Sequence, residues 1–122
     1  MYKVVFYETV NGYSQVWNFL EELRIAAADS KDARIQYKQA RLYIQLLQDN
    51  GTRINENVTK PIGNGIWELR PGNNRIFYFC FCGDTIVLLH QFRKKTRKTP
   101  TQEIARANAE RADYLARFGG DK

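Results

Sequence analysis

The sequence has little of what thiol and metal enzymes use most. It contains one histidine and two cysteines, Cys80 and Cys82, which lie two positions apart in an expected strand. Two thiols on the same side of one short segment form neither a favourable disulfide nor a complete metal site. We therefore expect buried, reduced cysteines, and we expect no metal ion and no other cofactor.

Long hydrophobic runs are also absent. No apolar stretch approaches the roughly 18 residues that a membrane-spanning helix requires. The N-terminal residues 1–8 are too short and too soon interrupted by polar residues to form a secretory signal. Hydrophobic residues make up 43% of the chain and charged residues 26%, which is typical of a globular domain. We expect one domain over residues 1–122, located in the cytoplasm and without a membrane partner.

Positive charge is in excess. The net charge is +6 and the pI is about 9.5, which favours an anionic partner without identifying it. Residues 93–98 concentrate this charge, with five cations in six positions: Arg93, Lys94, Lys95, Arg97 and Lys98. A solvated loop would explain such a run equally well if it stood alone.

Hydrophobic periodicity and turn residues predict an α+β fold. An antiparallel sheet is expected, with two N-terminal helices and a C-terminal helix packed on one face, in the order β-α-α-β-β-β-α. Strands are predicted over 2–7, 66–70, 75–82 and 85–92, with a short edge strand near 58–61. Helices are predicted over 13–28, from Ser30 or Asp32 to Asn50, and after a Thr99 N-cap. Their expected buried residues are Tyr13, Val16, Trp17, Leu20 and Leu23; Ile35, Leu42 and Leu46; and Ile104, Ala112, Leu115 and Phe118.

Two expected hairpins bring polar side chains to one end of the sheet. A four-residue loop after Arg70 places Arg70 opposite Arg75, and Glu68 opposite Phe77. A two-residue Gly83-Asp84 turn places Cys82 opposite Thr85, which puts Phe77 opposite His90 and Arg75 opposite Phe92. By strand parity, one face then carries Arg70, Arg75, His90 and Phe92 at this end, and Ile66, Phe79 and Leu88 at the other.

Each of these residues also has a purely structural interpretation. Arg70 and Arg75 could pair with Glu68 or with an acidic side chain of a helix. A single histidine among apolar residues, such as His90, is more often a core residue than a catalytic one. Phe77 and Phe92 are more often core residues than stacking platforms. The cluster indicates function more strongly than any of its members.

The available side chains suit RNA chemistry better than other reactions. The sequence has no suitably spaced carboxylate pair, no phosphate-cradling glycine loop and no Ser/His/Asp pattern. Arginine, lysine and histidine can stabilise charge on a phosphate. RNA supplies its own nucleophile in the 2′-hydroxyl, so cleavage needs a weak base, cations on the phosphorane oxygens and an acid for the leaving oxygen.

Four segments carry a resemblance to a known family: GIWELR (65–70), RIFYF (75–79), LLHQFRKKTRKTP (88–100) and EIARA (103–107). They are similar to the phage-derived Gp49-like branch of the RelE/ParE toxin superfamily, which includes HigB toxins. The resemblance implies a RelE-like fold, cleavage of mRNA on the ribosome, and inhibition by a cognate antitoxin with a helix-turn-helix domain, similar to HigA.

The resemblance also implies roles for individual residues. Arg70 and Arg75 match arginines that contact the scissile phosphate, and Lys94 and Lys95 match a basic segment after the last strand. His90 is a candidate general acid or base. RNA-binding roles are expected for Lys60, Arg93, Arg97 and Lys98.

The resemblance leaves the proton donor open. Tyr78 is expected on the face opposite Arg75, and Tyr114 lies far along the last helix. Two other functions also remain open. One is inhibition of DNA gyrase by a ParE-like toxin of the same fold, and the other is a non-catalytic module that binds RNA or protein.

Overall fold

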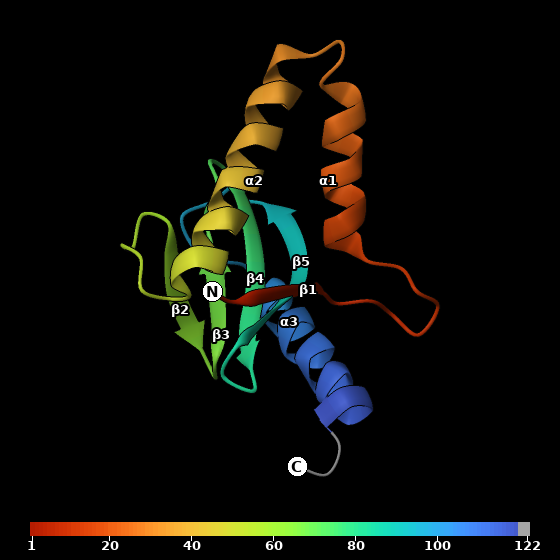
Figure 1. Ribbon diagram of the computed structural model, residues 1–122, viewed down its shortest axis with the longest axis vertical. Coiled ribbons are helices and arrows are strands. Elements are labelled where there is room, and N and C mark those ends of the chain that lie inside the picture. The colour runs from red at the N-terminus through yellow and green to blue at the C-terminus, as the bar shows by residue number, and fades with distance from the viewer. Residues whose placement is uncertain (120–122) are drawn as a thin grey trace.

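A five-stranded mixed sheet lies between two layers of helices (Figure 1). The computed structural model describes residues 1–119. The strands lie side by side in the order β1-β5-β4-β3-β2. The elements are β1 (Lys3–Phe6), α1 (Gln15–Ala26), α2 (Lys31–Asn50), β2 (Thr59–Gly63), β3 (Ile66–Leu69), β4 (Asn74–Phe81), β5 (Thr85–Arg93), α3 (Thr101–Tyr114) and a π-helical turn (Leu115–Gly119).

The expectation of a wholly antiparallel sheet was wrong at β1. This strand pairs in parallel with β5, with Val4 opposite Ile86 and Phe6 opposite Leu88, whereas β2 to β5 form an antiparallel meander. Two helices and three strands separate β1 from β5 in the chain, and a long connection of this kind permits parallel pairing. The α+β class and the short edge strand, seen as β2, are confirmed.

The β4–β5 hairpin differs from its predicted form in two compensating ways. Its connection has three residues, Cys82 to Asp84, so Phe81 rather than Cys82 lies opposite Thr85. A β-bulge then restores the register, because Tyr78 pairs with Leu88 and Phe77 with His90, which leaves Leu89 as the extra residue. The predicted pairs Phe77–His90 and Arg75–Phe92 are therefore confirmed.

The two faces of the sheet bury separate hydrophobic clusters. The face covered by α3, hereafter the α3 face, includes Ile66, Phe77 and Phe79, and it packs against Ala107 and Tyr114 of the helix. The face covered by the other two helices, hereafter the α1–α2 face, buries the remaining cluster. The prediction that all helices share one face was thus wrong. Leu88 was also misplaced, because the bulge turns it to the α1–α2 face with Tyr78.

Serine side chains begin both N-terminal helices. The hydroxyl of Ser14 accepts a hydrogen bond from the Trp17 backbone, and Ser30, as predicted, accepts one from Ala33. Gly51 follows the last residue of α2 with a φ of 64°, a conformation that glycine adopts without steric cost.

The buried stripe of α2 is not the predicted one. Ala33, Ala40 and Leu47 are its fully buried positions, whereas Ile35 and Leu42 are more than half exposed. The small alanines let the helix approach its neighbours closely, and the larger residues fall on the adjacent, outward surface. In and before α1, Val16 is buried as expected, but Tyr13 and Trp17 are about half exposed.

The C-terminal helix also differs in detail from its prediction. Its N-cap is Pro100 rather than Thr99, and no side chain caps it. Ala107 and Tyr114 are its buried residues, whereas Ala112, Leu115 and Phe118 are exposed. Both cysteines, expected to be buried, are free and exposed: Cys80 lies near the end of β4 and Cys82 in the turn. No helix within residues 1–119 is both long and apolar enough to cross a membrane.

Candidate functional site

Two arginines and a buried glutamate meet at one end of the α3 face. Arg70 directly follows β3, and Arg75 lies near the start of β4, so the loop between the strands brings them together. The Nε atom of Arg70 lies 3.5 Å from Oε1 of Glu68, and Nε of Arg75 lies 3.8 Å from Oε2. The pairing with Glu68, which the sequence left open, is therefore what the structure contains.

The two arginines differ in exposure. The Arg70 side chain is about one quarter exposed and donates to the backbone carbonyl of Glu56. Arg75 is largely buried, and its Nη1 donates to the carbonyls of Gly72 and Asn74 at 2.7 and 2.9 Å. Burial lowers the pKa of the Arg75 guanidinium, and the charge of Arg70 lowers it further, while Glu68 opposes both effects. Arg70 is thus the more accessible of the two cations.

Lysines from two other segments lie at the same end of the sheet. Lys60 of β2 pairs with Glu68 across the strands, which places it on the α3 face. The Lys94 backbone donates to Asn73, and its Nζ lies 3.5 Å from the Thr99 hydroxyl. The β4–β5 pairing thus continues beyond β5 and carries the basic segment past the arginines.

The other cations of the basic run divide between two directions. Arg93 turns toward the α1–α2 face, where its Nη1 donates to Gln36 of α2 at 3.0 Å. Lys95, Arg97 and Lys98 are exposed, and within the described residues none of them forms an ion pair. The predicted convergence is therefore confirmed for Arg70 and Arg75, which share Glu68, and it fails for the side chain of Arg93. For Lys94 only the backbone is brought to the loop between β3 and β4.

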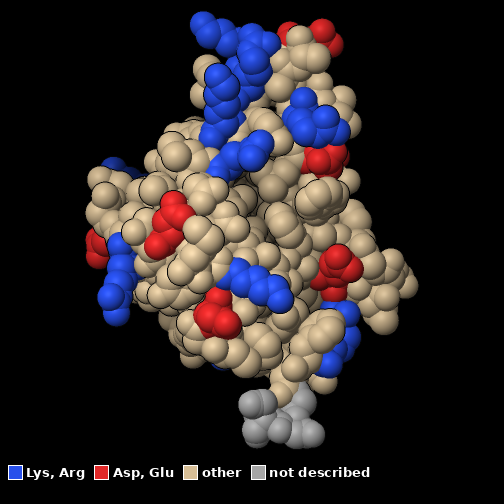
Figure 2. Space-filling view, in the orientation of Figure 1, with Lys and Arg blue, Asp and Glu red and all other residues tan. Residues whose placement is uncertain are grey.

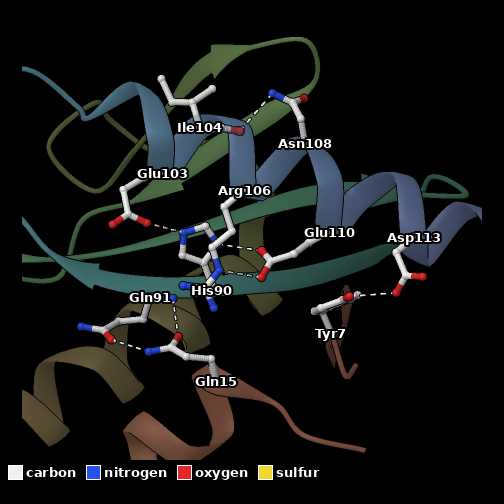
Figure 3. A network of polar contacts seen from close by, with 10 residues as sticks. All are labelled: Tyr7, Gln15, His90, Gln91, Glu103, Ile104, Arg106, Asn108, Glu110 and Asp113. Carbon is white, nitrogen blue, oxygen red and sulfur yellow. Dashed lines mark hydrogen bonds and ion pairs between the residues drawn. The ribbon is translucent and has the colours of Figure 1, made fainter. Parts of the chain in front are cut away.

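His90 is buried and held on both sides by helix α3 (Figure 3). Its Nδ1 lies 2.6 Å from Oε1 of Glu110, and its Nε2 lies 2.9 Å from Oε1 of Glu103. Glu110 also pairs with Arg106 at 3.0 Å. Both ring nitrogens are occupied, so in this conformation His90 can act on a substrate only through the glutamates. Within residues 1–119 no three His, Cys, Asp or Glu side chains are arranged to hold a metal ion.

Neither tyrosine considered as a proton donor reaches the arginines. Tyr78 points to the α1–α2 face, as parity predicted, and shares a hydrogen bond of 2.7 Å with Thr59. Its burial strongly raises the pKa of its hydroxyl. Tyr114 packs against Phe79 and Phe81 at the other end of the α3 face. Burial raises its pKa as well.

A second basic surface was not anticipated from the sequence. Figure 2 shows lysine and arginine side chains gathered over the far end of the α1–α2 hairpin. Lys31, Arg34, Lys38 and Arg41 are exposed on α2 and recur at helical spacing, which places them on one side of the helix. The spacing of these cations in the sequence could have predicted a basic side of the helix. The prediction was missed because apolar residues lie between the cations and indicated a buried face.

Glutamates of the site were also missed. Glu103 and Glu110 are seven residues apart, so they lie on the same side of α3 and can reach one histidine together. The spacing by itself did not identify their target, because His90 belongs to a strand whose covering helix had to be known first.

The fold and the sheet-end cations define a basic α+β protein. Comparison with family models identifies the class more closely: the model for phage-derived Gp49-like proteins matches residues 26–112, which is well over half of the chain. The chain therefore belongs to the Gp49-like family, a RelE/HigB-like toxin family, and this family indicates the toxin of a toxin–antitoxin pair. No curated protein gives a significant match.

Proposed function

We propose that this protein is a type II toxin that cleaves mRNA on the ribosome and thereby stops translation. The observation that carries the proposal is the pair Arg70 and Arg75, at the sheet end beside the basic segment, in a chain of a toxin family. Such a toxin would act in the cytoplasm, where ribosomes and mRNA are found. A cognate antitoxin, HigA-like and with a helix-turn-helix domain, would restrain it.

The chemistry requires RNA, side chains of this chain and water. The 2′-oxygen attacks the adjacent phosphorus as its proton passes to a water molecule, and the bond from phosphorus to the 5′-oxygen breaks as that oxygen takes a proton from the ammonium group of Lys94 or Lys95. We assign Arg70 and Arg75 to the negative charge that develops on the phosphorane oxygens. Lys94 and Lys95 are assigned to the leaving oxygen, while Lys60, Arg97 and Lys98 hold the flanking phosphates.

We assign His90 a positioning role rather than direct contact with RNA. It is fully buried, and its two nitrogens bind Glu103 and Glu110, so it fixes α3 on the sheet beside the arginines. Arg93 is likewise assigned a positioning role, because its hydrogen bond to Gln36 connects the end of β5 to α2. An antitoxin bound over the sheet end would block access to Arg70 and Lys95.

The test is primer extension on a defined mRNA in a purified translation system. Wild-type protein should produce cuts only when ribosomes are present. Arg70→Ala should reduce cutting by about 100-fold, because one charge-assisted contact to a transition state contributes about 3 kcal/mol. Arg24→Ala is the matched control, since Arg24 lies on α1 in an exposed pair with Glu21.

Three outcomes would contradict parts of this proposal. An intact message with wild-type protein would overturn the nuclease, and inhibition of DNA supercoiling by gyrase would then support the ParE-like alternative. Cutting in the absence of ribosomes would overturn ribosome dependence. Equal activity of Arg70→Ala and Arg24→Ala would remove the sheet end from the mechanism.

A further inference from the structure

A pocket of about 410 Å³ lies between the end of β5, the basic segment and the first turn of α3. Its lining includes Phe92, Lys95, Pro100, Gln102 and Glu103. Resting on the proposed function, we propose that this pocket holds one unpaired base of the RNA and distinguishes bases with an exocyclic amino group from uracil.

The position of Phe92 connects the pocket to the reacting phosphate. Phe92 lies directly opposite Arg75 in the β4–β5 ladder, and its side chain belongs to the α3 face. A base in the pocket would therefore belong to a nucleotide at or next to the phosphate held by the arginines. Lys95 on the pocket wall can pair with a phosphate of that same nucleotide.

The Phe92 ring provides an apolar surface for stacking. It is partly buried, and it packs against the rings of Phe77 and His90, whose centroids lie 5.2 Å and 6.2 Å from its own. A ring fixed in this way loses little freedom when a base stacks on it. Unpaired RNA bases commonly stack on aromatic side chains. Pro100 provides a second apolar wall.

Glu103 and Gln102 provide the polar edge of the pocket. Oε1 of Glu103 is held by His90 (Figure 3), whereas Oε2 accepts no hydrogen bond from the described part of the chain. His90 thus fixes the carboxylate and leaves one oxygen available. Gln102 is exposed at the same wall and can both donate and accept.

The free carboxylate oxygen sets the expected preference. A carboxylate accepts hydrogen bonds from the amino group of cytosine, and the amino groups of adenine and guanine are donors of the same kind. Uracil carries a carbonyl oxygen where cytosine carries its amino group, and two acceptors facing each other repel. We therefore expect cutting to favour a base with an amino group at one position of the target, by about tenfold over uracil.

The experiment maps cut sites across a library of mRNAs in the purified translation system. Wild-type protein is compared with Glu103→Gln, Phe92→Leu and the matched control Gln45→Ala, a glutamine on the exposed surface of α2. Glu103→Gln keeps an acceptor for His90 and gives the pocket an amide donor, so uracil should gain at the selected position. Phe92→Leu keeps an apolar side chain without a ring, and total cutting should fall about tenfold.

The outcomes separate this inference from the proposed function. If wild-type protein cuts no RNA, the proposed function fails. If it cuts, but Glu103→Gln changes only the rate and leaves the base preference of wild type intact, the pocket does not read a base and the inference fails alone. A shift toward uracil in Glu103→Gln and none in Gln45→Ala would support it, because loss of fold lowers the rate without exchanging one base for another.

Discussion

Nε of Arg75 lies 3.8 Å from Oε2 of Glu68, and neither atom makes a hydrogen bond within residues 1–119. Glu68 is fully buried and Arg75 nearly so. Charges removed from water in this way depend on their partners, and Glu68 has a second partner in Arg70, whose Nε lies 3.5 Å from Oε1. The same contacts with Glu68 therefore stabilise the sheet and hold the arginines in place.

This dependence predicts strong coupling in a double-mutant cycle. Arg75→Ala should lower the free energy of unfolding by about 2 kcal/mol, because it removes one of the two arginines that compensate the buried Glu68 carboxylate. Arg75→Ala combined with Glu68→Gln should cost clearly less than the sum of the single changes. Urea denaturation of the four proteins measures this, and additive costs would show that the pair is not energetically coupled.

The contact between His90 and α3 predicts that the helix detaches when the histidine is removed. His90→Leu would leave Glu103 and Glu110 facing an apolar side chain, at a cost of about 3 kcal/mol. Hydrogen exchange should then accelerate first in α3. Arg106→Gln is the control, because Arg106 is half exposed and its pair with Glu110 should contribute under about 1 kcal/mol. Equal protection of α3 in both variants would contradict the prediction.

The C-terminal end of α3 predicts a dependence of stability on acid pH. Asp113 accepts hydrogen bonds from Arg117 at 2.7 Å and from Tyr7 at 2.8 Å. Arg117, and to a lesser extent Tyr7, hold the pKa of Asp113 below its ordinary value of 3.8. Because the folded pKa is depressed, this contribution is fully present above pH 3.8 and is lost as the pH falls through the folded value.

Thermal unfolding between pH 2 and 6, at about half-unit steps, checks this sign. Asp113→Asn should flatten the acid part of the stability curve. Arg117→Gln should flatten it more than Tyr7→Phe, because the arginine is the larger cause of the shift. A curve that is unchanged in Asp113→Asn would assign the acid sensitivity to other carboxylates.

The exposed basic segment predicts a specific salt dependence of RNA binding. Replacing Lys95, Arg97 and Lys98 with glutamine should weaken binding to single-stranded RNA. It should also reduce the slope of log affinity against log salt by about 2, at about 0.7 for each phosphate contact. The comparison variant replaces Lys31, Lys38 and Arg41 on α2, which removes the same charge elsewhere. A larger slope change in that variant would move the RNA-binding surface to the α1–α2 hairpin.

The sequence by itself determined the local elements and much of the site. Alternation, helical spacing and turn residues are short-range properties, so they predicted the strand and helix order and the pairing of Arg75 with Phe92. Two errors in the β4–β5 hairpin cancelled, since the longer turn was offset by the bulge at Leu89. The sheet-end position of Arg70 and Arg75 was accessible from parity alone.

Only the tertiary structure decided which surfaces are covered. Placing α3 on the face opposite α1 and α2 buries His90 between Glu103 and Glu110 and makes it a positioning residue in our proposal. Burial of α2 through Ala33 and Ala40 turns Ile35 and Leu42 outward, because close packing selects small residues that hydrophobicity alone ranks low. These outcomes depend on contacts between segments far apart in the chain, which no local pattern records.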